Sequence, residues 1–62
     1  MYQKYVLLRN KGKTSDYRVS KDTGITKSTF ADWKSGRSTP KLDKLQKIAD
    51  YFGVPITYFL EE

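Results

Sequence analysis

Residues that can hydrogen-bond to a nucleobase edge gather on one face of a short stretch of the chain. In a helix over residues 26–34, at about 100° per residue, the small and polar side chains fall on one side: Ser28, Ala31, Asp32 and Ser35, with Lys27 in the first turn. A short polar face of this kind lets a helix approach base edges closely. An ordinary solvent-facing helix is the commoner interpretation, so periodicity alone leaves both open.

The opposite face of the same stretch carries large apolar rings. Phe30 and Trp33 fall together there, with Ile25 just ahead of the helix, and this face is predicted to pack inward. In the preceding stretch, over residues 15–22, Val19 and Ser20 are predicted to point inward. A serine at that place suggests that two helices come too close for a larger side chain.

A glycine turn separates these two stretches. Ser15 can cap a helix that runs to about residue 22, and Thr26 can cap a second helix that runs to about residue 34. Gly24 tolerates positive φ and suits the sharp turn between them. Two short helices joined in this way form a helix-turn-helix over about residues 15–35, and its second helix can enter a DNA groove. Tyr17 and Arg18 are expected at the rim, from which Arg18 could reach a phosphate.

The charge of the chain is unevenly distributed. The formal net charge is +5, and eleven of the twelve Lys and Arg residues lie in residues 9–47. Residues 48–62 contain Asp50, Glu61 and Glu62 and no base. A basic region that coincides with the helix-turn-helix suits the phosphates of a nucleic acid, although a solubilising surface would look the same.

Composition argues against catalysis and against metal binding. The chain has no Cys and no His, so it lacks thiolate ligands, the commonest metal ligand and the usual general base. Without a histidine, hydroxyls such as that of Ser28 lack the usual general base that would activate them as nucleophiles. We therefore expect neither an enzyme nor a cofactor, and no small-molecule ligand is evident. The apolar run near the N-terminus is too short for a secretory core or a membrane span, which favours a soluble protein of the cytoplasm.

The remaining segments complete a single all-α domain of five short helices over residues 1–62. A helix over residues 2–10 closes at a turn over residues 11–13. Thr39 and Pro40 are predicted to cap and open a helix over residues 41–52. Its apolar stripe consists of Leu42, Leu45, Ile48, Ala49 and Phe52.

A last short helix is expected over residues 56–60, where three large side chains are crowded together. Tyr58, Phe59 and Leu60 cannot all face one side of a helix, so at least one of them is predicted to be partly exposed. This end either closes the edge of the core or offers an apolar patch to a second copy of the chain. The candidate residues for such self-association are Pro55, Ile56, Tyr58 and Phe59.

With these residues in place, the chain resembles the lambda-repressor-like helix-turn-helix family, of the Cro and phage-repressor type, also called XRE. The resemblance extends over nearly the whole chain. It is carried by a small residue in the middle of the first helix of the motif, a Gly-apolar pair, the apolar positions of the second helix, the Trp-x-x-Gly pattern and a later proline. Here these are Ser20, Gly24-Ile25, Phe30, Trp33 with Gly36, and Pro40.

The resemblance implies a sequence-specific, double-stranded DNA-binding transcriptional regulator, a repressor of phage or prophage type that acts as a homodimer in a bacterial cytoplasm. The helix over residues 26–34 would lie in the major groove of a partly palindromic operator. By position, the base-reading residues would be Lys27, Ser28 and Asp32, with Thr26 and Ala31 close by. Phosphate contacts would come from Arg18, Lys34, Arg37, Ser38 and Lys41.

Three positions depart from the family pattern. Asp16 stands where a glutamine commonly contacts a phosphate, Lys34 follows the tryptophan in place of a glutamate, and Gly12 comes one place earlier than usual. Asp16 and Asp32 put acid on the side expected to face DNA. They keep open an alternative, a protein-interaction module of the same fold that acts as an antitoxin-like or anti-repressor partner. For Asp32, the alternatives to DNA contact are a local pair with Arg37 and a solvated charge.

Overall fold

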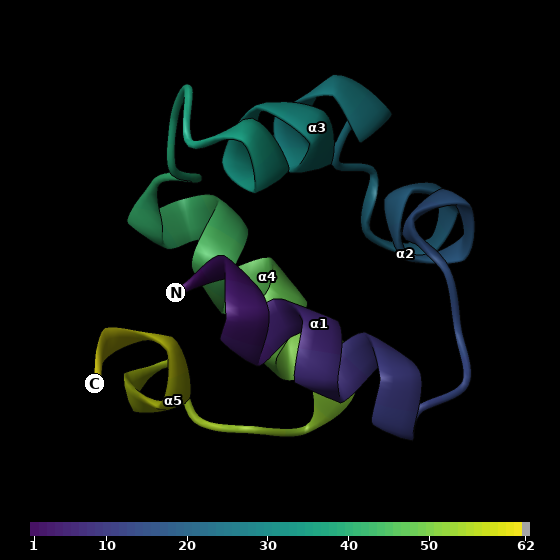
Figure 1. Ribbon diagram of the computed structural model, residues 1–62. Helices are drawn as coiled ribbons and strands as arrows, with labels where there is room; N and C mark the ends of the chain where they lie inside the picture. The colour runs from purple at the N-terminus through teal and green to yellow at the C-terminus, as the bar shows by residue number, and fades with distance from the viewer. Residues whose placement is uncertain (62) are drawn as a thin grey trace.

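Five short helices make up residues 1–61, the part of the chain that the computed structural model describes (Figure 1). They are α1 (Tyr2–Lys11), α2 (Asp16–Thr23), α3 (Lys27–Ser35), α4 (Leu42–Phe52) and α5 (Thr57–Leu60). No strand occurs among these residues. The prediction of an all-α fold with five short helices is confirmed.

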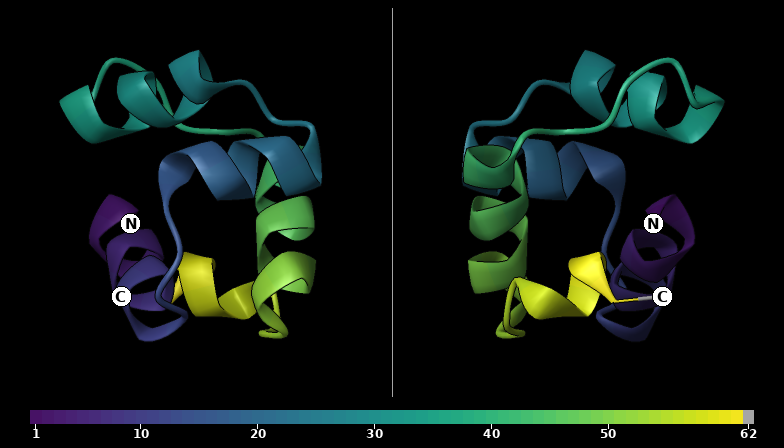
Figure 2. Two further views of the ribbon diagram at one scale, coloured as in Figure 1. Left: turned by 90° about the vertical axis from the view of Figure 1, so that its right-hand side faces the viewer. Right: turned by 90° about the vertical axis from the view of Figure 1, so that its left-hand side faces the viewer.

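The third helix, α3, lies at one end of the molecule. In both views of Figure 2, α3 and the loop that follows it lie beyond the other four helices. The two chain ends lie near one another on the inner side of α3, where α1 packs against α5 (Figure 2). There the Lys4 ammonium donates to the Tyr58 carbonyl oxygen at 2.8 Å, and the Tyr58 hydroxyl donates to the Lys4 carbonyl oxygen at 3.3 Å.

A cluster of aromatic rings forms the centre of the core. The Tyr5 ring lies 5.0 Å from the Phe30 ring and 5.3 Å from the Trp33 ring, centroid to centroid. Trp33 also lies 6.0 Å from Phe59. Rings of this size bury much apolar surface, and their offset and tilted contacts add to the stabilisation. The buried apolar residues are Tyr5, Val19, Ile25, Phe30, Trp33, Leu45, Ile48, Ala49 and Phe59, so the inward direction of Phe30 and Trp33 is confirmed.

The turn between α2 and α3 forms as predicted. The Ser15 hydroxyl accepts a hydrogen bond from the Arg18 amide at 3.2 Å and so caps α2. Gly24 ends α2 with a φ of +79°, a left-handed conformation that suits glycine. The Ser20 hydroxyl donates to the Ile25 carbonyl oxygen. Ser20 therefore stabilises the turn through a hydrogen bond, in addition to being small enough for close packing of the helices.

The start of α4 differs from the prediction. The helix begins at Leu42 with Lys41 as its N-cap, so Thr39 is not the cap and Pro40 is not in the first turn. Pro40 is buried, and the chain remains extended through Lys41, whose ψ is 167°. The cap thus lies two residues later than predicted, at Lys41 in place of Thr39, and the buried Pro40 precedes the helix. Leu42, expected in the apolar stripe, is 61% exposed, whereas Leu45 and Ile48 are buried.

In the turn between α1 and α2, the residue with a left-handed backbone conformation is a lysine. Gly12 has a φ of −81°, which any residue can adopt, and Lys13 has a φ of +53°. Side chains other than glycine and asparagine are strained in this region. Because the glycine comes one place early in the sequence, the following lysine takes the strained conformation.

Candidate nucleic-acid interface

The outer face of α3 is accessible to solvent. Figures 1 and 2 show this face pointing away from the rest of the molecule. Lys27, Ser28 and Ala31 are exposed on it, as is Thr26 at its start, and Asp32 is half-buried. All five residues predicted to read bases therefore lie on one accessible surface. Because Phe30 and Trp33 hold the opposite side of α3 in the core, this surface is fixed in direction.

Hydroxyl groups crowd the start of α3. Thr26 is the N-cap residue, but its side chain makes no capping hydrogen bond to a backbone amide. Its hydroxyl instead lies 3.2 Å from the Ser28 hydroxyl and 3.1 Å from the Thr29 hydroxyl. The N–H groups of the first turn are thus left without a side-chain cap. Groups of this kind can bind an anionic oxygen.

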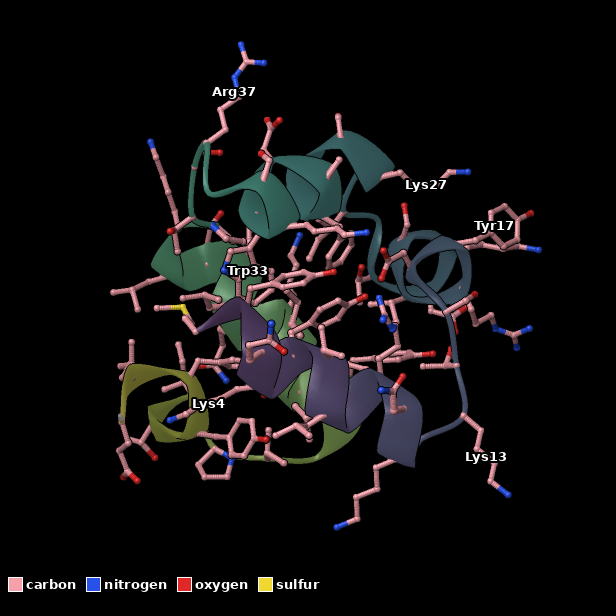
Figure 3. The ribbon with its side chains drawn as sticks, viewed as in Figure 1. Lys4, Lys13, Tyr17, Lys27, Trp33 and Arg37 are labelled. Carbon is pink, nitrogen blue, oxygen red and sulfur yellow. The ribbon has the colours of Figure 1, made fainter. Side chains whose placement is uncertain are left out.

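Lys27 extends from the first turn of α3 towards α2. Its ammonium nitrogen lies 5.1 Å from the centroid of the Tyr17 ring, in the range of a cation–π contact (Figure 3). Tyr17 is the second residue of α2 and is 59% exposed. The sequence placed Tyr17 at the rim but gave no sign of this contact, because the spacing of residues 17 and 27 depends on the angle between the two helices.

The Asp32 side chain is unpaired within residues 1–61, in which the ion pairs are those of Arg9 with Asp16 and Arg18 with Asp22. The local pair with Arg37 is not formed. Instead the backbone joins the two residues, since the Arg37 amide donates to the Asp32 carbonyl oxygen at 2.9 Å. The Arg37 side chain points away from the body of the molecule (Figure 3). Both charges are therefore available to an external partner.

Four of the five predicted phosphate-contact residues are exposed near the C-terminal end of α3: Lys34, Arg37, Ser38 and Lys41. Three of them lie in the loop between α3 and α4. Thr39 is also exposed in this loop. The sequence predicts Thr39 as the cap of the next helix, but the cap lies at Lys41, so the Thr39 hydroxyl is accessible for a phosphate contact.

Arg18 is engaged on a different side of α2. Its Nε lies 3.0 Å from Oδ2 of Asp22, and the same oxygen accepts a hydrogen bond of 2.7 Å from the Tyr51 hydroxyl of α4. These hydrogen bonds, from Tyr51 foremost and then from Arg18, hold the pKa of Asp22 below its usual value. A phosphate contact by Arg18 would require this exposed pair to open.

Asp16, the acid at the start of α2, has its charge compensated within the protein. Its Oδ1 accepts hydrogen bonds from the Tyr5 hydroxyl at 2.6 Å and from Nη1 of Arg9 at 2.7 Å. Burial works against the charged form, but these two bonds outweigh it and keep the pKa of Asp16 below its usual value. The repulsion of a phosphate expected from the sequence is correspondingly reduced.

The predicted self-association residues do not form one free patch. Phe59 is 2% exposed and belongs to the core, so its assignment to a dimer surface is wrong. Tyr58 is half-buried and bonded to Lys4, and Ile56 is half-buried, whereas Pro55 is exposed. Leu60 is 51% exposed, which confirms that one of the three crowded residues reaches solvent. Phe59 turns inward because α5 is a single turn whose buried side faces Trp33.

Over residues 1–61, no cluster of three or more His, Cys, Asp or Glu side chains is placed to hold a metal ion. Nor does any helix there have the length and apolar character needed to cross a membrane.

Comparison with known proteins adds an independent observation. A family model described as a helix-turn-helix matches residues 7–59. The chain is also similar to a protein of Vibrio cholerae described as the cryptic phage CTXphi transcriptional repressor RstR. The two are 30% identical over 59 residues, a match that covers 81% of this chain and 53% of the relative. The chain thus spans about half the length of that relative. No solved structure gives a significant match.

Proposed function

The chain belongs to the lambda-repressor-like (XRE) helix-turn-helix family of DNA-binding transcriptional regulators, and we propose that it is a phage-type repressor that reads a major groove with α3. The observation that carries this proposal is the uncovered outer face of α3, held in direction by the burial of Phe30 and Trp33 behind it. The similarity to a phage repressor supports the choice of repressor over activator.

The side chains on that face match the groups of a major groove. The Lys27 ammonium can donate to O6 and N7 of guanine, and the unpaired Asp32 carboxylate can accept from the amino group of cytosine. The Ala31 methyl suits the methyl group of thymine. Ser28 and Thr26 add hydroxyls that both donate and accept. Together these five residues would cover adjacent base pairs of one half-site.

Phosphate contacts would position the domain on both sides of the groove. Lys34 lies in the last turn of α3, and Arg37, Ser38 and Lys41 lie in the loop that follows, where exposed cations, hydroxyls and loop amides can meet one strand. Arg18 is a candidate on the other side if its exposed pair with Asp22 opens. Because the free energy of such contacts comes largely from counterion release, affinity should fall steeply as salt rises.

We further propose that two copies bind a partly palindromic operator with half-sites about one helical turn apart, in a bacterial cytoplasm. One domain of this size makes few contacts, and a second copy supplies the rest. The surface for self-association would use Pro55, Ile56 and the exposed edge of Tyr58, with Leu60 in place of Phe59.

A protein-interaction module of the same fold is the second candidate, and one observation still favours it. The Asp32 carboxylate lies unpaired on the presumed DNA side, where it could meet a basic protein surface. Asp16 no longer supports this candidate, because Arg9 and Tyr5 already compensate its charge.

Two linked experiments test the proposal. The purified protein is first titrated into mixed-sequence duplex DNA at low salt by fluorescence anisotropy, and we expect binding that weakens as salt is added. A random-site selection then follows, from which we expect a two-fold symmetric consensus. Failure to bind any duplex at low salt would exclude the repressor and leave the protein-interaction module. Binding without any sequence consensus would refute reading by α3.

A further inference from the structure

The contact between Lys27 and Tyr17 joins the two helices of the motif at the edge that would meet DNA. The Lys27 ammonium lies 5.1 Å from the centroid of the Tyr17 ring, and both side chains are exposed (Figure 3). Tyr17 leaves 59% of its surface in water, so burial of the ring does not explain its presence at this position. On the side that faces α3, the Tyr17 ring contacts Lys27.

The carboxylates of α2 are not available to Lys27. Asp16 is paired with Arg9 and bonded to Tyr5, and Asp22 is paired with Arg18. Lys27 forms no ion pair with any residue in the described part of the chain. The aromatic ring is thus the group on α2 that attracts the ammonium.

A ring holds a cation differently from a carboxylate. The face of the ring attracts the ammonium electrostatically but carries no net charge and accepts no full hydrogen bond. The lysine therefore keeps its whole charge and its N–H donors for an outside acceptor. A lysine that is already restricted in the free protein also loses less side-chain entropy when it binds.

We propose that Tyr17 is a positioning residue for Lys27, whose ring holds the ammonium at the α2–α3 edge without neutralising it and so sharpens the base preference that Lys27 confers. This inference rests on the proposed reading of DNA by α3. It extends that reading to a residue of α2 which need not touch a base itself.

The first test needs no DNA. Ring currents of Tyr17 should shift the terminal methylene protons of Lys27 upfield in the NMR spectrum of the free protein. We expect the shift to persist in Tyr17→Phe, which keeps the ring, and to vanish in Tyr17→Leu, which removes it. Equal Lys27 shifts in the parent protein and in Tyr17→Leu would overturn the proposal whatever the protein does with DNA.

The second test is a double-mutant cycle on the duplex obtained by random-site selection and on duplexes changed at single base pairs. Lys27→Ala identifies the base pair at which preference is relaxed. We expect Tyr17→Leu to lower the preference at that same base pair by about two- to five-fold, the size of an exposed cation–π contact. Tyr17→Phe should keep the preference, and Tyr17→Leu should add nothing in the Lys27→Ala background.

A matched control distinguishes positioning from a general effect. Tyr51→Leu removes another exposed tyrosine, on α4, and should leave the base preference unchanged. If Tyr17→Leu weakens every duplex equally, or if Tyr17→Phe is as damaging as Tyr17→Leu, the proposal is refuted and the hydroxyl is a phosphate contact. Absence of binding by the parent protein would instead refute the proposed function, and the NMR result would stand separately.

Discussion

The phenol oxygen of Tyr5 lies 2.6 Å from Oδ1 of Asp16, so a buried ring of α1 is hydrogen-bonded to the first residue of α2. Arg9 donates to the same oxygen. This arrangement fixes the start of α2 against α1, and it places a negative charge where the positive end of the α2 dipole favours one. A position that commonly carries a phosphate-binding glutamine in the family has here become an internal link between helices.

Acid should destabilise the protein through this link. The folded-state pKa values of Asp16 and Asp22 are both lowered, so their stabilisation is present above the ordinary aspartate pKa and is lost as pH falls through the folded-state values. We expect the urea midpoint to fall as pH is lowered from about 5 to about 3. Asp16→Asn should show a smaller fall, because only Asp22 then contributes. A fall of unchanged size in Asp16→Asn would contradict the role given to Asp16.

The Tyr5 hydroxyl should be worth a measurable free energy by itself. Tyr5→Phe keeps the aromatic contacts in the core but removes the donor to a charged acceptor, so we expect a loss of about 1–2 kcal/mol in the free energy of unfolding. Urea denaturation followed by the fluorescence of Trp33 measures it. Tyr17→Phe removes an exposed hydroxyl instead and should change stability by less than about 0.5 kcal/mol. Equal effects of the two variants would show that the bond to Asp16 contributes nothing.

Relief of the strained residue in the α1–α2 turn should stabilise the fold. Lys13 has a φ of +53°, and glycine adopts this conformation without the steric cost. We expect Lys13→Gly to raise the free energy of unfolding by about 0.5–1 kcal/mol, after the greater chain entropy of glycine is subtracted. Lys13→Ala is the control: it removes the same charge and keeps the strain, so it should not stabilise. Thermal unfolding followed by circular dichroism separates the two.

The tryptophan of α3 should matter for folding more than for base choice. Trp33 is 4% exposed and contacts the rings of Tyr5 and Phe59, so Trp33→Ala should cost about 3–5 kcal/mol and unfold much of the protein. Leu42→Ala truncates an apolar side chain that is 61% exposed, and should be nearly neutral. A folded Trp33→Ala protein with an altered base preference would refute the assignment of the two faces of α3.

Base and phosphate contacts should respond differently to substitution. Lys27→Ala should relax the preference at one base pair, at a cost of about 1–3 kcal/mol on the preferred duplex. Arg37→Ala should weaken all duplexes by similar factors and reduce the slope of log affinity against log salt by about 1. Anisotropy titrations at several salt concentrations, on preferred and changed duplexes, measure both quantities. A sequence-selective effect of Arg37→Ala would move that residue to the base-reading set.

Periodicity predicted the parts of this fold that apolar packing determines. The inward direction of Phe30 and Trp33 follows from their spacing, because only one face of a short helix can reach the core. The start of α4 could not be predicted in the same way. Thr39-Pro40 has the form of a helix start, but whether a proline opens a helix or fills the core depends on the neighbouring chain in three dimensions.

Contacts between side chains on different helices also could not be predicted from the sequence. The sequence predicts that the charge of Asp16 repels a phosphate, but it does not predict the partners Tyr5 and Arg9 that reduce this repulsion. Both partners lie on another helix, and their approach depends on the angle between α1 and α2. The same holds for Lys27 and Tyr17. For the candidate site, sequence thus predicted which residues are accessible, and the structure adds which of them are engaged with one another.

The packing of α1 against α5 has a practical consequence for the design of fusion proteins that contain this domain. Lys4 and Tyr58 hold the two helices together, and both chain ends lie on the inner side of α3, opposite its outer face (Figure 2). A fluorescent reporter or an affinity tag could therefore be fused at either end without crowding the surface that we propose binds DNA. Two copies could likewise be joined in tandem by a flexible linker, which would fix their stoichiometry and leave both recognition faces unobstructed.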